Sequence, residues 1–296
     1  MLAERMGAEV AAVGARTGAV FPEQGQSVSW TGFGAVIPVL AGSSGAGASS
    51  VAAAIADAVT TDRRCVLLVD ADEPARSGLA QAAGVEGPWT RPVTEHVQVR
   101  YSWRGRPGRG PLLGRVETTL PALTPGMVPA PPDWLPDPRP EPLHVVVADL
   151  GCGRWRAADS PIAGAGGWLR AGHPSPRPIL VVRATRPSLR QAEQTLTRLE
   201  PLIQAGAAAP VCQLVVVAAK KWPAGIDGTV GPRVSELLDD AVFLPPTPAV
   251  EIGGVTADPI PTRVLDALRP LLASWGVIAP LPGSPAARQH ARRRDR

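Results

Sequence analysis

The sequence predicts a three-layer, doubly wound α/β fold built on a mostly parallel sheet. From about residue 35 onward, short apolar runs alternate with longer segments of helical character, as in successive β–α–β units. The apolar runs are almost unbroken, which is typical of strands covered on both faces. A glycine-rich segment, 42–49, lies between the first apolar run and the first helical segment, where such folds bind anions.

The expected elements follow from this alternation. Strands are predicted at 36–41, 65–70, 144–149, 179–183 and 213–218, and helices at 49–59, 75–83, 188–204, 234–239 and 262–274. Pro38 lacks the N–H that a central strand uses, so the first strand is expected to start there or to contain a bulge.

The chain divides into three regions. Residues 1–34 are expected to form an N-terminal helix and a linker, and 35–276 the main domain. An insertion at 86–143 is expected to contain a β-hairpin, 97–103 with 114–119, followed by a proline-rich connector without regular structure. Residues 277–296 are predicted to be a disordered basic tail.

Charge and composition set further expectations. The net charge is only +4, but five arginines fall within 287–296, so this tail is a candidate for nonspecific DNA binding or is a solvated terminus. Cys65, Cys152 and Cys212 have no metal-binding spacing and are expected to be reduced and buried. No signal peptide and no apolar run of transmembrane length is present, which predicts a cytoplasmic protein.

The segment from Gly42 to Ser49 fits the phosphate-binding pattern G-x-x-x-x-G-K-[ST] except that Ala48 replaces the lysine. Glycines allow the backbone N–H groups to point inward, and the following helix adds the positive end of its dipole. The Ser49 hydroxyl is a candidate ligand for Mg²⁺. An anion-binding loop is therefore expected even without the lysine.

Downstream motifs make a family resemblance specific. The loop is followed by VLLVDADEPARSGLA, HVVVADLG, ILVVRATRPSLRQAEQTL and VFLPPTPAVEIGG. This order, over roughly 35–274, resembles the ParA/MinD-like family of deviant-Walker P-loop ATPases. It looks closest to a divergent actinobacterial branch found on plasmid-like and conjugative elements.

The resemblance implies a set of site residues. Phosphates would contact the loop, Mg²⁺ would be held at Ser49, Asp72 and Asp149, and Asp72 would orient the attacking water. The cofactors would be ATP or ADP with Mg²⁺. The expected nucleotide-binding residues are Gly42, Ser44, Gly45, Ala46, Gly47, Ala48, Ser49, Ser50, Lys220 and Pro245.

The sequence departs from the family at two lysines. Family members carry one lysine near the start of the loop and one before the Ser/Thr, and here Ser43 and Ala48 stand at those positions. Because phosphoryl transfer depends on stabilising charge, hydrolysis is expected to be slow or absent. Arg76, Arg183 and Arg186 are candidate replacement cations, although each of them also fits an exposed surface position.

Two functions remain open. In the first, the chain is a degenerate nucleotide-binding switch or scaffold that serves DNA partition, conjugation or secretion, with a homodimer or another protein as partner. In the second, it is a pseudo-ATPase interaction scaffold that binds no nucleotide. A dinucleotide-binding oxidoreductase is disfavoured, because the loop lacks the G-x-G-x-x-G spacing.

Overall fold

The computed structural model describes residues 28–137, 142–151, 164–226, 228 and 230–280 of the 296-residue chain. The predicted N-terminal helix, Cys152 and the arginines of the basic tail lie outside the described residues. The division of the chain into three regions therefore stays a prediction.

A nine-stranded sheet forms the centre of the molecule, in the order β11-β10-β9-β2-β7-β3-β6-β5-β4. The strands in this order are β11 (Val242–Leu244), β10 (Gln213–Val217), β9 (Ile179–Arg183), β2 (Ala35–Ala41), β7 (Val145–Asp149), β3 (Val66–Asp70), β6 (Leu112–Thr118), β5 (Val97–Trp103) and β4 (Val85–Pro92). Every ladder from β11 to β6 is parallel, and β5 pairs antiparallel with both of its neighbours. The predicted mostly parallel α/β sheet is confirmed.

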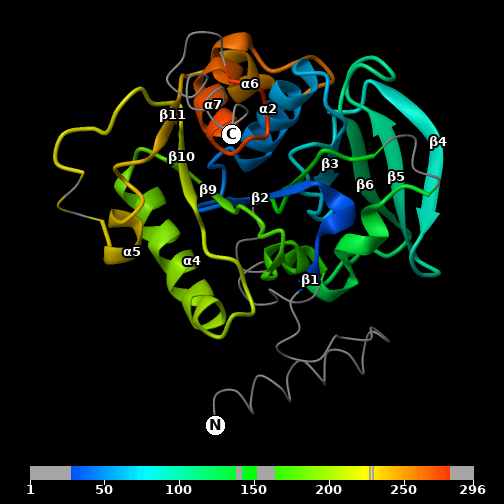
Figure 1. Cartoon of the computed structure of the whole chain (residues 1–296), viewed down its shortest axis with the longest axis horizontal. Helices are drawn as coiled ribbons and strands as arrows, with labels where there is room; N and C mark the ends of the chain where they lie inside the picture. Colours follow the sequence, from blue (N-terminus) through cyan, green and yellow to red (C-terminus); the bar gives the residue numbers. More distant parts are fainter. Residues whose placement is uncertain (1–27, 138–141, 152–163, 227, 229, 281–296) are drawn as a thin grey trace, which may run out of the picture.

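Helices cover both faces of this sheet (Figure 1). On one side lie α2 (Ala48–Thr61) and α7 (Thr262–Ser274), and on the other lies α4 (Arg186–Gln204). Along β7, Val145 and Val147 pack into the first layer, whereas Val146 and Ala148 pack into the second. This alternation explains why the strand is apolar at successive positions, since both of its faces are buried.

Shorter elements complete the described fold. Strands β1 (Val28–Ser29) and β8 (Gly172–His173) form a separate parallel pair. The remaining helices are α5 (Pro232–Ser235), α6 (Pro248–Gly253) and the 3₁₀ turns η1 (Thr31–Phe33), η2 (Pro125–Met127), η3 (Pro131–Trp134) and η4 (Gly164–Leu169). No helix within the described ranges is long and apolar enough to span a membrane.

Two predicted helices differ from the structure. The helix expected at 75–83 is absent, because this segment forms turns in which the Ser77 hydroxyl bonds Asp70 and also accepts from the Leu79 amide. The helix expected at 234–239 is instead α5, which begins earlier and ends at Ser235. Glu193 of α4 accepts a 2.9 Å hydrogen bond from the Val234 amide and so holds the first turn of α5.

The insertion also differs from its prediction. It contributes three strands rather than a two-stranded hairpin, and β6 continues the main sheet by pairing with β3. The connector that follows contains η2 and η3, and it buries Leu123, Val128 and Trp134. Burial of these side chains holds the connector against the domain.

Two further predictions are wrong. β2 starts at Ala35, before Pro38, and continues without a bulge. Its ladder with β9 begins only at Val39, so the proline nitrogen precedes that pairing. Cys65 is half-buried and Cys212 is exposed, although both were expected to be buried.

Candidate phosphate-binding site

The glycine-rich loop connects β2 to α2 at the carboxyl end of the central strands. The Gly42 amide donates to the Val181 carbonyl at 2.8 Å, which ties the start of the loop to β9. Gly45 and Gly47 have φ values of 68° and 97°, in the left-handed region that favours glycine. Gly47 is the N-cap of α2, so the helix begins directly where the loop ends.

A cavity of about 380 Å³ lies over this loop. The structure brings most of the predicted nucleotide-binding residues to it, namely Ser44, Gly45, Ala46, Gly47, Ala48, Ser49, Ser50 and Pro245, together with Asp72. Two predicted residues do not line it: Gly42 sits at the base of the loop, and Lys220 is exposed elsewhere.

Of the opposite wall of the cavity, only Pro245 was predicted from the sequence. This wall comes from α6 and the segment that leads to α7, and its lining residues include Thr247, Glu251, Val255 and Ile260. The signal for α6 was present, since Pro248 occupies its first turn and Gly254 follows its end. Pro245 and Thr247 place this wall directly after β11.

Two buried carboxylates lie side by side beneath the loop. Asp70 of β3 and Asp149 of β7 are partners in the parallel register, and their side chains are 3% and 0% exposed. The Oδ1 atom of Asp149 accepts a 3.0 Å hydrogen bond from the Gly151 amide, whereas its Oδ2 atom has no hydrogen-bond partner among the described residues. An acceptor buried in this way favours a cation or a proton.

Burial also shifts the protonation of this pair. It raises the pKa of Asp149 to about 6, while hydrogen bonds from the Ser49 side chain and the Gly151 amide act in the opposite direction. Burial, and then the charge of Asp149, raise the pKa of Asp70 to about 7, whereas the hydrogen bond from Ser77 lowers it. Both carboxylates therefore bind protons more readily than exposed aspartates do.

The segment after β3 packs against the loop at very short range. A Cβ atom built on Gly78 would lie 2.3 Å from the Ser49 hydroxyl oxygen. A Cβ atom on Gly151 would lie 2.1 Å from Oδ2 of Asp72, whose carboxylate also accepts a 2.8 Å hydrogen bond from the Glu73 amide. Ser49 and Asp72 line the cavity, and the buried carboxylate of Asp149 lies close to both of them. Their role as a magnesium site stays a prediction.

The donor set fits Mg²⁺. A serine hydroxyl beside carboxylates, one of which has an oxygen without a hydrogen-bond partner, supplies the hard oxygen ligands that Mg²⁺ prefers, with water and phosphate oxygens completing its shell. Within the described part of the chain, no group of three or more His, Cys, Asp and Glu side chains forms a metal site of protein ligands alone.

The positions of the two missing lysines differ in their surroundings. Ser43 is 6% exposed, and its hydroxyl lies 2.7 Å from that of Ser188 on α4. Ala48 is 4% exposed and lines the cavity. Of the three candidate replacement arginines, Arg76 and Arg183 line the cavity and Arg186 does not.

Strand, glycine-rich loop and helix together define a phosphate-binding-loop α/β fold. Solved structures with a similar fold include ParA and MinD ATPases. Among them are the MinC:MinD cell division protein complex of Aquifex aeolicus (16% identity, 80% of this chain and 95% of that chain, TM-score 0.49) and the cell division ATPase MinD of Pyrococcus furiosus (18%, 86% and 94%, 0.47). A ParA family ATPase from Chlorobium tepidum TLS matches at 12% identity (80% and 99%, 0.45).

No protein-family model matches the sequence, and no curated protein matches it.

Proposed function

We propose that this protein binds ATP or ADP with Mg²⁺ over the loop 42–49, hydrolyses it slowly or not at all, and uses the bound state as a switch or scaffold. The observation that carries the proposal is the glycine-rich loop at the start of α2, beneath a cavity of about 380 Å³ that Ser49 lines and beside the buried carboxylate of Asp149.

Binding would be divided among three groups of atoms. Backbone N–H groups of the loop and the positive end of α2 would contact the phosphates. The Ser49 hydroxyl would bind Mg²⁺ directly and Asp149 through water, and Asp72 would orient an attacking water. Bound Mg²⁺ would neutralise phosphate charge.

Slow turnover is proposed because neither loop position that carries a lysine in the resembled family has one here. Ser43 is occupied by its contact with Ser188, and Ala48 offers only a methyl group. Hydrogen-bonding backbone groups can hold a ground-state phosphate, but they stabilise the developing charge of phosphoryl transfer less than a cation does.

The partners of the switch are proposed from the motif resemblance. A nucleotide-dependent homodimer or a complex with another protein would position DNA or a conjugation or secretion assembly. The arginines of 287–296 would add nonspecific DNA binding, whose affinity should fall steeply with salt.

A second function is favoured by one observation. Because the loop has no lysine of its own, the fold could serve only as an interaction scaffold that binds no nucleotide. The two proposals differ in one measurable property, which is Mg²⁺-dependent nucleotide affinity.

Calorimetric titration of ATP and ADP, with and without Mg²⁺, tests this property. Wild type should bind both nucleotides more tightly with Mg²⁺, and Ser49→Ala should lose that gain. Ser175→Ala is the matched control, because Ser175 lies in the loop before β9 and does not line the cavity. Absence of binding at millimolar nucleotide would favour the scaffold. If nucleotide binds, a phosphate-release assay measures its turnover.

A further inference from the structure

The chain contains only two lysines, Lys220 and Lys221, and neither lines the cavity. Any fixed cation from the described residues at the cavity must therefore be an arginine, and the two that line it are Arg76 and Arg183. They are held differently. Arg76 lies 3.6 Å from the Glu73 carboxylate, and its side chain is 65% exposed.

Arg183 is hydrogen-bonded to the backbone of the loop. Its Nε atom donates a 3.0 Å hydrogen bond to the Gly45 carbonyl, although the two residues are 138 positions apart in the sequence. Among the described residues, no carboxylate lies within ion-pair distance of its guanidinium. The two terminal amino groups therefore keep their hydrogen-bonding capacity for an anion.

The backbone of Arg183 is fixed by the same elements that fix the loop. Its amide donates to the Ser188 hydroxyl at 3.0 Å, and its carbonyl accepts from the Thr185 amide at 2.7 Å. The Ser188 hydroxyl in turn lies 2.7 Å from that of Ser43 in the loop. Arg183 is thus connected to the loop twice. Its backbone is connected through Ser188 to Ser43, and its side chain is bonded to the Gly45 carbonyl.

The strand order places this arginine opposite the carboxylates. β2, which leads into the loop, lies between β9, which ends at Arg183, and β7, which ends at Asp149. The loop therefore has a cationic side and a carboxylate side. A polyphosphate with its Mg²⁺ has the complementary arrangement, since the metal requires carboxylates and the remaining phosphate oxygens require a cation.

We propose that Arg183 is the phosphate-binding cation of this site and takes the part that a loop lysine plays in other phosphate-binding loops. This inference rests on the proposed nucleotide binding and names the residue that supplies its positive charge. A guanidinium on the neighbouring strand binds two phosphate oxygens at once, whereas an ammonium group acts as a point charge.

The test uses the full chain with Mg²⁺ and three ligands: ATP, inorganic tripolyphosphate and adenosine. Arg183→Ala should weaken the affinity for ATP and tripolyphosphate by about 10- to 100-fold, as expected for the loss of a hydrogen-bonded charge, and leave adenosine binding unchanged. Arg183→Lys should restore part of the loss. The matched control is Arg186→Ala, an exposed arginine that does not line the cavity.

The outcomes separate the two proposals. Equal affinities in Arg183→Ala and Arg186→Ala, with wild type binding both phosphate ligands, would overturn the role of Arg183 alone. The same would follow if Arg183→Ala weakened adenosine and ATP equally, since the arginine would then not act on phosphate. If wild type bound neither ATP nor tripolyphosphate, the proposed function and this inference would both fail.

Discussion

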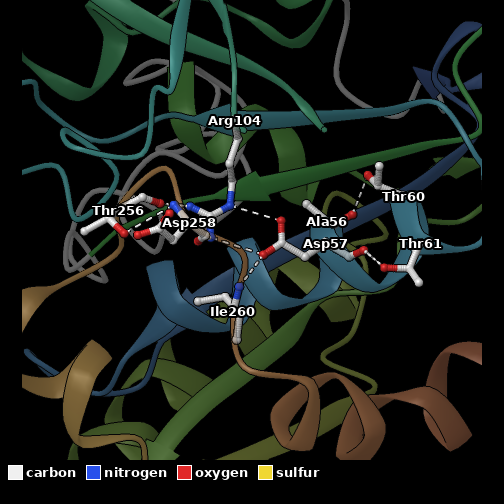
Figure 2. A network of polar contacts seen from close by, with 8 residues as sticks. All are labelled: Ala56, Asp57, Thr60, Thr61, Arg104, Thr256, Asp258 and Ile260. Carbon is white, nitrogen blue, oxygen red and sulfur yellow. Dashed lines mark hydrogen bonds and ion pairs between the residues drawn. The ribbon is translucent and has the colours of Figure 1, made fainter. Parts of the chain in front are cut away.

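The guanidinium of Arg104 and the carboxylate of Asp57 form a buried bidentate ion pair, with N–O distances of 3.0 and 3.1 Å (Figure 2). Arg104 also donates to the backbone carbonyls of Thr256 and Asp258, and the Ile260 amide donates to Asp57 at 2.8 Å. The pair therefore joins three parts of the molecule: the turn after β5, the helix α2 that begins at the glycine-rich loop, and the wall of the cavity.

Breaking this pair should destabilise the protein strongly. Arg104 and Asp57 are only 2% and 7% exposed, so Asp57→Asn or Arg104→Met would leave a buried group without its charge partner or its hydrogen bonds. The expected loss in the free energy of unfolding is about 3–5 kcal/mol, measured by denaturant titration. Arg100→Ala, in the half-exposed pair with Glu117, is the control and should cost at most about 1 kcal/mol. Equal losses at the two pairs would contradict this account.

The buried carboxylate of Asp70 should make the stability of the metal-free protein depend on pH. Its pKa is raised from 3.8 to about 7 in the folded state, so the folded state favours the protonated form. The stabilising contribution is complete below about pH 4 and is lost as the pH rises through about 7.

Asp70→Asn should therefore raise the free energy of unfolding at pH 8, in the presence of a chelator, by a few kcal/mol relative to wild type. The amide oxygen can still accept the hydrogen bond from Ser77. Thermal melts from pH 4 to 8 would measure the slope, and the exposed Asp239→Asn should keep the wild-type slope. If stability fell with pH as steeply in Asp70→Asn as in wild type, Asp70 would not be the cause of the pH dependence. Asp149 should still contribute to the pH dependence between about pH 4 and 6 in both proteins.

The parallel sheet and the loop could be predicted because their signals are local. An unbroken apolar run such as that of β7 reports burial on both faces, and the glycines at 45 and 47 report left-handed backbone. The conformation of segment 75–83 could not be predicted, because it is set by contacts with residues distant in the sequence. Ser77 bonds the end of β3, and Gly78 touches Ser49.

The extension of the sheet and most of the far wall of the cavity were missed for a different reason, because neither segment carries a regular apolar pattern. β4 contains Gly87 and Pro88, and its register with β5 shifts between Glu86 and Thr90, so it has no regular alternation. α6 buries none of its side chains, and Ile252 on it is 89% exposed, so no apolar face indicated it. Arg183 could be named as a candidate cation, but its hydrogen bond to Gly45, 138 positions away, could not be predicted from local pattern.

Restoring the loop lysine should increase both affinity and turnover. Ala48→Lys completes the pattern G-x-x-x-x-G-K-S and adds a cation at a position that already lines the cavity. Phosphate release should rise by at least about tenfold over wild type. Ala75→Lys, which adds the same charge in the exposed turn beside Arg76, should leave turnover at the wild-type level. Unchanged turnover in Ala48→Lys would show that the missing lysine is not what limits hydrolysis.

The close contact between Gly78 and Ser49 predicts a sharp size limit. In Gly78→Ala, the new methyl group would lie 2.3 Å from the Ser49 hydroxyl oxygen, so the loop or the segment after β3 must move. Mg²⁺-dependent ATP affinity, measured by calorimetry, should fall by about tenfold or more, because the serine would leave its place beside Asp149. In Gly253→Ala the methyl group meets nothing within 4 Å, so this control should bind as wild type does.

Ala218, directly after β10, should be a site of stored backbone strain. Its φ of 60° lies in the left-handed region, which costs an L-residue about 1–2 kcal/mol, whereas glycine adopts it freely. Ala218→Gly should raise the free energy of unfolding by about 0.5–1 kcal/mol, because the relief of strain exceeds the entropy that glycine adds to the unfolded chain. Ala219→Gly, one residue later, relieves no left-handed strain and should lower stability by about the same amount. Chemical denaturation of both variants distinguishes the two effects, and a loss of stability in both would show that Ala218 is not strained.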